Sequence, residues 1–175
     1  TSALAANVNA LAENHQVIDG REYIVYDDML VPYTPFQTLS EFDVTKPQWT
    51  DGIVYYAFDL AVTAENKQRF IEASKIWSDV AQVSFIERTN QANYINITNS
   101  TKNSATVGMV GGKQVFTMSD WSHKFVIVHE LGHTLGMWHE QQRADRDAYV
   151  DVILDNVQDD QRFNFTIKST TNYSQ

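Results

Sequence analysis

The pattern of apolar and polar positions predicts an α+β domain that begins at about Trp49. Ile53–Phe58 is a nearly continuous apolar run of strand length, which indicates a strand. From Ala64 to Val80 the apolar residues recur at helical spacing, and Thr63 precedes them as a candidate N-cap. This part of the chain therefore opens with a strand and a long helix that has one apolar face.

Further strands are predicted after this helix. Val83–Ile86 and Tyr94–Ile97 are short runs with β-branched and aromatic residues, a composition typical of strands. Thr106–Val110 and Gln114–Met118 lie on either side of the pair Gly111-Gly112. This arrangement predicts a β-hairpin with a Gly-Gly turn.

A second helix is predicted to start near Ser122 and to carry two histidines on one side. Phe125–Val128 is apolar, so the first part of this helix is expected to be mostly buried. His129 and His133 stand four residues apart, which separates them by about 40° of rotation and roughly 6 Å of rise. Both rings therefore face one side, where two imidazole nitrogens can reach one metal ion. Glu130 is offset by one residue, where it can accept a proton from a metal-bound water.

Gly136 and His139 extend this motif. A glycine three residues after His133 can adopt a left-handed conformation, end the helix and turn the chain back. His139 then approaches from another direction as a third nitrogen ligand. Three protein ligands leave coordination positions open, as in catalytic rather than structural zinc sites. The extended pattern takes three of the five histidines in the chain, so a coincidental set of histidines on a buried helix is the weaker interpretation.

The sequence HELGHTLGMWH at residues 129–139 resembles the long zinc-binding motif of the metzincins. Its continuation, EQQRADRDAYV, is similar to the astacin branch of that group, and a weaker similarity runs from about Trp49 to the chain end. The resemblance implies a zincin-like α+β fold, in which a twisted mixed β-sheet carries a backing helix and an active-site helix and is preceded by an extended pro-segment. It also implies a single Zn²⁺ ion held by His129, His133 and His139.

Astacins are secreted or surface zinc endopeptidases that are usually made as zymogens. The resemblance therefore implies hydrolysis of protein or peptide substrates, with Glu130 as the catalytic base. It also implies a secreted protein whose signal peptide has already been removed. The chain would divide into an inhibitory pro-segment, residues 1–48, and an astacin-like catalytic domain, residues 49–175, that holds the N-terminal subdomain and the start of the C-terminal one.

Residues 1–48 differ in pattern from the rest. Tyr23–Tyr26 is strand-like and all three prolines of the chain lie in this region, which predicts an extended segment lying across a surface. Astacin pro-segments carry a Phe-x-Gly-Asp type motif whose aspartate replaces the catalytic water on zinc. Val25–Leu30 resembles it loosely, with Asp28 at the aspartate position and the phenylalanine and glycine unmatched. Phe42-Asp43 is a second candidate, and the alternative for Asp28 is an ordinary surface turn.

The resemblance also implies how such a pro-form would be activated. The activating cut is expected near Lys46 to Trp49, just before the catalytic domain. In mature astacins the glutamate next to the third histidine, here Glu140, pairs through solvent with the new N-terminus. The alternative for Glu140 is an ion pair with Arg143 or Arg146 in the same loop.

Composition excludes some classes of partner. The net charge of −9 argues against nucleic acid, because phosphate binding needs basic patches. No apolar run approaches the length of a membrane span. The chain has no cysteine, which departs from the two disulfides of many animal astacins and rules out latency through a cysteine.

The resemblance stops before the family pattern is complete. Metzincins have a methionine-containing turn beneath the zinc, and astacins place a tyrosine ligand just after it. No methionine occurs from Glu140 to Gln175, and neither Tyr149 nor Tyr173 stands in the family's sequence context. We therefore expect either that the chain is a fragment of a longer enzyme or that the remainder is a separate chain; a native protein that ends at Gln175 is the weaker interpretation.

Two other functions stay open. One is a different metzincin or a zinc hydrolase that acts on non-peptide amides, and the sequence after His139 argues against it. The other is a non-catalytic zinc-binding module or a pseudoenzyme fragment. The intact Glu130 argues against this second function, because a purely structural zinc site has no need of a base.

Overall fold

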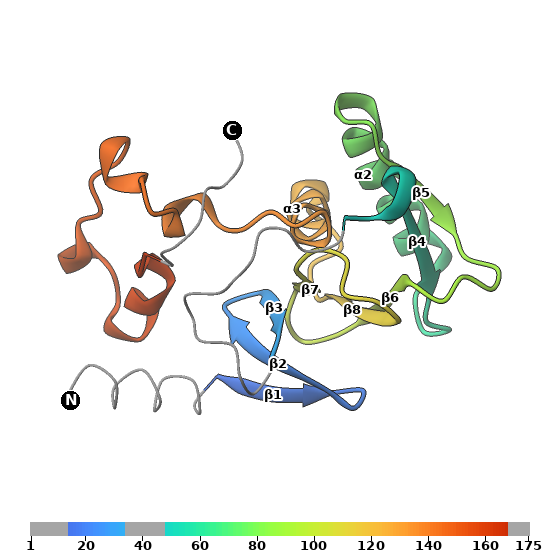
Figure 1. The fold of residues 1–175 in the computed structure, drawn as a ribbon, viewed down its shortest axis with the longest axis horizontal. Coiled ribbons are helices and arrows are strands. Elements are labelled where there is room, and N and C mark those ends of the chain that lie inside the picture. The colour runs from blue at the N-terminus through green and yellow to red at the C-terminus, as the bar shows by residue number, and fades with distance from the viewer. Residues whose placement is uncertain (1–13, 34–47, 168–175) are drawn as a thin grey trace.

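The computed structural model describes residues 14–33 and 48–167. Eight strands form one mixed sheet (Figure 1), with antiparallel pairs at the N-terminal end and parallel pairs among β4, β5, β6 and β8. The sheet order is β1-β2-β3-β7-β8-β6-β4-β5. The strands are β1 (His15–Ile18), β2 (Arg21–Tyr26), β3 (Met29–Pro32), β4 (Ile53–Phe58), β5 (Ser84–Glu87), β6 (Tyr94–Asn99), β7 (Ser104–Thr106) and β8 (Lys113–Met118).

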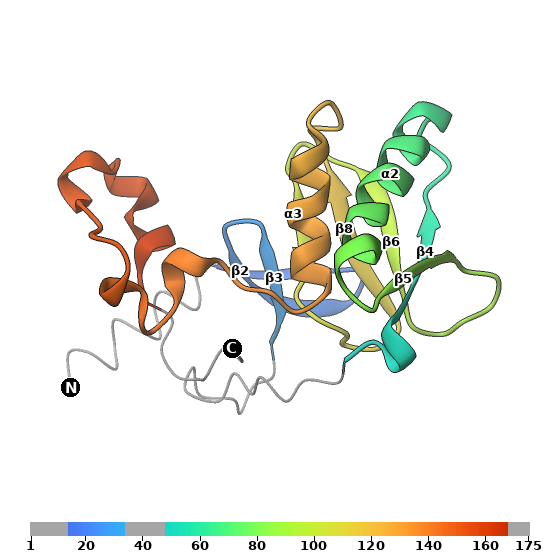
Figure 2. The same cartoon turned by 90° about the horizontal axis from the view of Figure 1, so that it is seen from above.

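Helices α2 (Ala64–Val80) and α3 (Lys124–Thr134) lie side by side against the sheet (Figure 2). The predicted cap of α2 is confirmed, because the Thr63 side chain accepts a hydrogen bond of 3.2 Å from the Asn66 nitrogen. Phe70 of α2 is fully buried, and its ring packs against aromatic rings from three strands: Tyr56, Phe58, Phe85 and Phe116. This packing fixes α2 on the sheet and gives α3 a rigid neighbour.

The described part of the N-terminal segment, residues 14–33, belongs to the sheet, a pairing that the sequence does not predict. It is extended, as predicted, but β1, β2 and β3 pair with one another in antiparallel order. β3 then pairs in parallel with β7, with Met29 opposite Ala105 and Leu30 opposite Thr106. A cluster of buried side chains joins β2 and β3 to the loop after β7; it contains Ile24, Tyr26, Met29, Val31 and Val107.

The prediction of a tight Gly111-Gly112 turn between two strands is wrong. β7 and β8 do pair in antiparallel order, but β7 ends at Thr106 and residues 107–112 form a longer loop. The apolar side chain of Val107 is buried against β2 and β3. The Val107 backbone nitrogen donates a hydrogen bond of 3.0 Å to the Leu30 carbonyl. Apolar character here marks a buried loop and not a strand.

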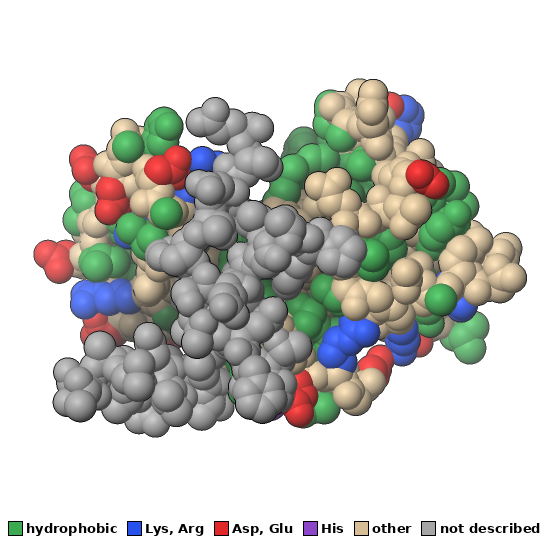
Figure 3. Space-filling view, viewed as in Figure 1, with side chains coloured by type: hydrophobic (Ala, Val, Ile, Leu, Met, Phe, Trp, Pro, Cys, Tyr) green, Lys and Arg blue, Asp and Glu red, His purple; other side chains and the backbone are tan. Residues whose placement is uncertain are grey.

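Residues after α3 form short 3-10 helices that lie to one side of the sheet (Figure 1). Residues 150–153 have no helix or strand. Acidic side chains are gathered over this segment on the face shown in Figure 3. Within the described residues, no helix is long and apolar enough to cross a membrane. The 3-10 helices after α3 are η2 (Glu140–Gln142), η3 (Arg146–Ala148), η4 (Leu154–Asn156) and η5 (Asp159–Phe165), and η1 (Thr50–Gly52) precedes β4.

Candidate metal centre

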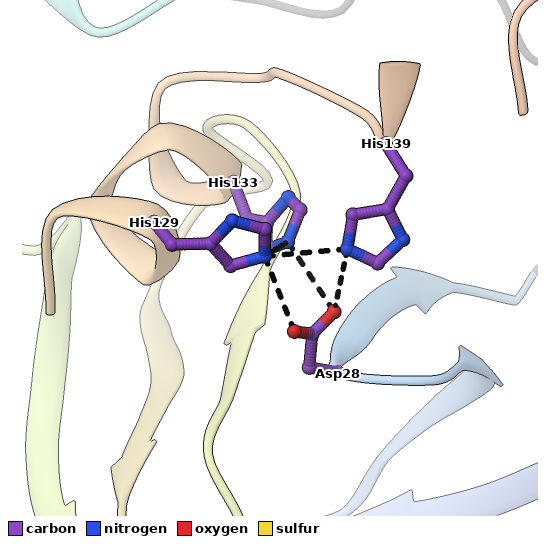
Figure 4. Close-up of side chains that lie close together, drawn as sticks. All are labelled: Asp28, His129, His133 and His139. Atoms are coloured by element: carbon purple, nitrogen blue, oxygen red, sulfur yellow. Dashed lines mark hydrogen bonds and ion pairs between the residues drawn. The ribbon is translucent and has the colours of Figure 1, made fainter. Parts of the chain in front are cut away.

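Four of the predicted site residues meet in one cluster (Figure 4). His129 and His133 come from α3, His139 from the loop after it, and Asp28 from the turn between β2 and β3. Their nearest ligand atoms all lie within 4.8 Å of one another. Two distant parts of the chain, the β2–β3 turn and α3 with its following loop, therefore present three nitrogens and a carboxylate to a common point.

The end of α3 positions the third histidine. The helix ends at Thr134, and Gly136 adopts a φ of +101°, a conformation that favours glycine. Gly136 and Met137 donate backbone hydrogen bonds of 2.8 and 3.0 Å to the carbonyls of His133 and Gly132. This closing turn reverses the chain, as the sequence predicts, and brings His139 back to the helix.

The histidine rings are oriented for metal binding. His133 Nδ1 lies 2.8 Å from the Met137 carbonyl, and because a carbonyl can only accept, Nδ1 carries the hydrogen. In the neutral ring the lone pair is then on Nε2, which faces the cluster. His129 Nε2 lies 3.0 Å from His133 Nε2 and 3.3 Å from His139 Nε2. His133 and His139 are buried, whereas His129 is partly exposed.

Asp28 lies at the tip of the β2–β3 hairpin. Tyr26 pairs with Met29, so Asp27 and Asp28 form a two-residue turn, with Asp27 at a φ of +60°. The Asp28 carboxylate lies 3.0 Å from His139 Nε2, 3.2 Å from His129 Nε2 and 3.3 Å from His133 Nε2. Burial alone would raise the pKa of Asp28, but the three histidine rings that face the carboxylate hold this pKa well below its usual range.

The donor set fits one zinc ion. Three imidazole nitrogens and a carboxylate oxygen are ligands that Zn²⁺ prefers. Asp28 Oδ1 is a buried atom without a hydrogen bond, although it lies 3.3 Å from His133 Nε2 and 3.0 Å from His139 Nε2. Lone pairs that converge in this way repel one another unless a cation or a proton lies among them. The cluster therefore has the chemistry of a metal centre rather than of a hydrogen-bonded core.

Glu130 lies beside the cluster, and almost all of its side chain is buried. Its Oε2 atom is buried without a hydrogen-bond partner. Burial, followed by the negative charges of Asp28 and Asp27, raises the pKa of Glu130 to about 9. A cation among the histidines would lower this pKa, since positive charge favours the ionised carboxylate.

Two tryptophans tether α3, a role that no motif in the sequence predicts. Trp49 Nε1 donates to the Thr134 carbonyl and Trp77 Nε1 donates to the Val128 carbonyl, both at 2.9 Å. A Cβ added at Gly132 would lie 3.4 Å from the Trp77 ring, so glycine allows the close approach of α2 and α3. The indole N–H of a buried tryptophan usually has a hydrogen-bond partner. That rule is the one signal in the sequence that could have predicted these two contacts.

Glu140 lies outside the cluster. Its carboxylate is exposed and lies 3.4 Å from Arg143 Nη1, the alternative considered from the sequence. Arg143 also pairs with both carboxylate oxygens of Asp145, at 2.9 and 3.0 Å. Arg146 donates to the carbonyls of Gln141 and Phe165 and so holds the loop to the last 3-10 helix. Phe42-Asp43, the second candidate for the inhibitory aspartate, and Lys46 fall outside the described residues.

A cleft of about 720 Å³ opens beside the cluster. His129 and Glu130 line one end, and Lys124 and Phe125 at the start of α3 line another part. Asp28 also lines this cleft, so the N-terminal hairpin borders the space that leads to the histidines.

Comparison with known proteins identifies the family. The family model described as Astacin (Peptidase family M12A) matches residues 42–175. The chain belongs to the astacin family. Its fold is similar to the solved structure of high choriolytic enzyme 1, a hatching enzyme zinc-protease from the medaka fish Oryzias latipes. The TM-score is 0.65 at 27% identity, and the match covers 72% of this chain and 64% of that one. The α+β metzincin-like fold expected from the sequence is thus confirmed.

Curated relatives of this astacin are much longer proteins. It is 36% identical over 120 residues to bone morphogenetic protein 1 of Xenopus laevis, a match that covers 67% of this chain and 17% of that protein. It is also 36% identical over 124 residues to tolloid-like protein 1 of Homo sapiens, covering 69% of this chain and 12% of that protein. The chain therefore spans less than a fifth of the length of these relatives.

Proposed function

We propose that this astacin is a zinc-dependent endopeptidase, held latent by its N-terminal hairpin through the carboxylate of Asp28. The observation that carries the proposal is the convergence of three histidine Nε2 atoms beside a buried glutamate oxygen that has no partner. Family membership supports the same reaction. Such an arrangement supplies both metal ligands and a base, the two requirements of metal-assisted hydrolysis.

In this proposal each residue has a separate role. His129, His133 and His139 would hold the ion through neutral imidazoles. Bound zinc supplies a Lewis acid that polarises the scissile carbonyl and acidifies a water molecule. Glu130 accepts a proton from the attacking water and passes it to the leaving amine. Because Glu130 follows His129 on α3, the base and a ligand are fixed to one rigid helix.

Protein or peptide substrates fit the surroundings of the site. The cleft beside His129 and Glu130 is open and large enough for substrate side chains. Its rim includes the apolar ring of Phe125, which is 72% exposed. A substrate in this cleft would place a peptide carbonyl near both the metal ligands and the base.

Latency would result because the Asp28 carboxylate competes with the catalytic water for one position on the zinc ion. Asp28 lies within 3.3 Å of all three histidine Nε2 atoms, so its carboxylate would occupy a position on the ion that hydrolysis requires. The hairpin also borders the cleft. The pro-segment is thus an intramolecular inhibitor that blocks the ion and part of the approach to it.

The division into residues 1–48 and 49–175 is part of this proposal. Trp49 supports it, because its ring is buried and its indole bonds to the end of α3. The catalytic part is therefore anchored from Trp49 onward, and a cut between Lys46 and Trp49 would free the hairpin. Glu140 is exposed and thus accessible to a new N-terminus after the cut. We also place the protein outside the cell, as the astacin resemblance implies.

The test compares wild type with Glu130→Gln in the full-length protein. Zinc content and casein cleavage after trypsin treatment are measured together, with Glu87→Gln on exposed β5 as the control. We expect one zinc per chain in all three proteins and at least about a hundredfold loss of cleavage in Glu130→Gln alone. Retained turnover in that variant would sink the assignment of the base. Zinc binding without any cleavage by wild type would favour a non-catalytic zinc module.

A further inference from the structure

The loop between β7 and β8, residues 107–112, is held from within by one side chain. Gln114 is fully buried although it is polar. Its Nε2 donates to the Gly108 carbonyl and its Oε1 accepts from the Val110 nitrogen, both at 2.8 Å. A single amide therefore satisfies a donor and an acceptor of the loop backbone, which no apolar side chain could do.

The same loop contacts the turn that follows α3. The Gly108 nitrogen donates to the His133 carbonyl at 2.9 Å, and Gly136 donates to that carbonyl as well, at 2.8 Å. Gly108 and Gly136 pack closely, since a Cβ added at Gly108 would lie 3.8 Å from Gly136 Cα. Both glycines have positive φ values, of +70° and +101°. The loop thus fixes the backbone at a metal-ligating histidine.

This turn also orients the histidine rings. His133 Nδ1 bonds to the Met137 carbonyl at 2.8 Å, so the ring is held by the residue that follows Gly136. His139 lies two residues beyond Met137. A shift of the turn would therefore move the His133 ring and the His139 backbone together.

We propose that Gln114 is a positioning residue for the zinc site, acting through Gly108 on the turn that sets His133 and His139. The inference rests on the proposed zinc site. Groups that orient metal ligands from outside the coordination sphere commonly change metal affinity by about 10- to 100-fold when they are removed. Gln114 acts one step further out, through a rigid loop, so we place its effect near tenfold.

Thr106 offers a matched control. It is also fully buried, and its Oγ1 donates to the Val115 carbonyl at 3.2 Å and accepts from the Val115 nitrogen at 3.1 Å. Thr106→Val therefore removes a donor and an acceptor from the same sheet but leaves the Gly108 contacts intact. A second control is Asn93→Ala, because Asn93 Oδ1 accepts from the Gly112 nitrogen at the outer end of the loop.

The experiment measures zinc affinity by competition with a chromophoric chelator, the visible spectrum of the cobalt-substituted protein, and the thermal stability of the zinc-free protein. We expect Gln114→Met to weaken zinc binding about tenfold and to shift the cobalt absorption bands. Thr106→Val should lower thermal stability without either change, and Asn93→Ala should leave zinc affinity as in wild type. Gln114→Glu keeps an oxygen acceptor for the Val110 nitrogen, so its loss of zinc affinity should be smaller. If Gln114→Met does not fold, the zinc affinity and cobalt spectrum of Gln114→Glu test the proposal in its place.

Equal zinc affinity and equal cobalt spectra in the Gln114 and Thr106 variants would overturn the proposal. Failure of the zinc site itself would look different. In that case wild type would bind no stoichiometric zinc, or His133→Ala would bind it as tightly as wild type does.

Discussion

Asp28 Oδ1 lies 3.0 Å from His139 Nε2, although the two residues stand far apart in the sequence. The contact depends on two reversals of the chain. The two-residue turn at Asp27 and Asp28 presents one partner, and the glycine turn at Gly136 presents the other. The carboxylate on which the latency proposal rests thus lies next to a proposed zinc ligand.

Removal of the Asp28 carboxylate should open the site to small metal-binding inhibitors. We expect Asp28→Ala to bind acetohydroxamate at least about tenfold more tightly than wild type in the zinc-loaded chain, because an intramolecular competitor at high effective concentration is lost. Calorimetric titration measures this. The control is Asp27→Asn, since Asp27 is exposed and adjacent. Equal affinity in Asp28→Ala and wild type would contradict the latency proposal.

Away from the metal centre, two polar contacts attach the N-terminal hairpin to the β7–β8 region. These two contacts should differ in how much they stabilise the hairpin. Arg21 Nη2 donates to the Gly111 carbonyl at 2.7 Å in a partly buried setting, so Arg21→Ala should destabilise the hairpin by about 1.5–3 kcal/mol. The ion pair of Lys113 with Asp19 is exposed on both sides, so Lys113→Ala should cost only about 0.2–1 kcal/mol. Amide hydrogen exchange in β2 and β3 distinguishes them, and a larger effect at Lys113 would reverse this ranking.

Gly136→Ala should weaken both the fold and the metal site. At a φ of +101° an alanine is strained, and we expect a loss of about 1–3 kcal/mol in unfolding free energy. The zinc affinity should fall as well, because the turn carries the chain to His139. Gly20→Ala is the matched control: Gly20 has a φ of +79°, and a Cβ added there would meet nothing within 4 Å, so its strain should leave zinc affinity unchanged. Chemical denaturation and chelator competition report the two effects.

Docking of the hairpin should weaken in alkali. Burial raises the pKa of Tyr26 to about 12, above its ordinary value of 10.0. Because the folded state disfavours the phenolate, the stability that Tyr26 contributes is fully present below about pH 10 and is lost as the pH rises through about 12. Unfolding curves of wild type and Tyr26→Phe should diverge over this window, with the variant less sensitive to pH. Parallel curves would show that Tyr26 does not titrate in this way.

Local patterns in the sequence predict much of this fold. The bounds of α2 follow from helical spacing and the Thr63 cap. Gly136 turns the chain back after α3, as expected. The histidine spacing also predicts the metal cluster, because the periodicity of one helix fixes how two rings face. These features depend on residues close together in sequence.

Non-local features could not be predicted in the same way. The parallel pairing of β3 with β7 joins Leu30 to Thr106, and no short-range pattern encodes it. The sequence wrongly predicts a tight turn at Gly111 and Gly112, because the apolar residues Val107 and Val110 resemble part of a strand. The backbone of that loop is instead satisfied by buried Gln114, whose burial only the tertiary structure reveals.

The most direct test of the central claim is an anomalous difference map, collected at the zinc absorption edge from crystals of the zinc-loaded chain. We predict a single peak in contact with Nε2 of His129, His133 and His139 and with a carboxylate oxygen of Asp28, at roughly 2.0–2.2 Å. A peak at another place, or a water molecule where the Asp28 oxygen is expected, would contradict the account.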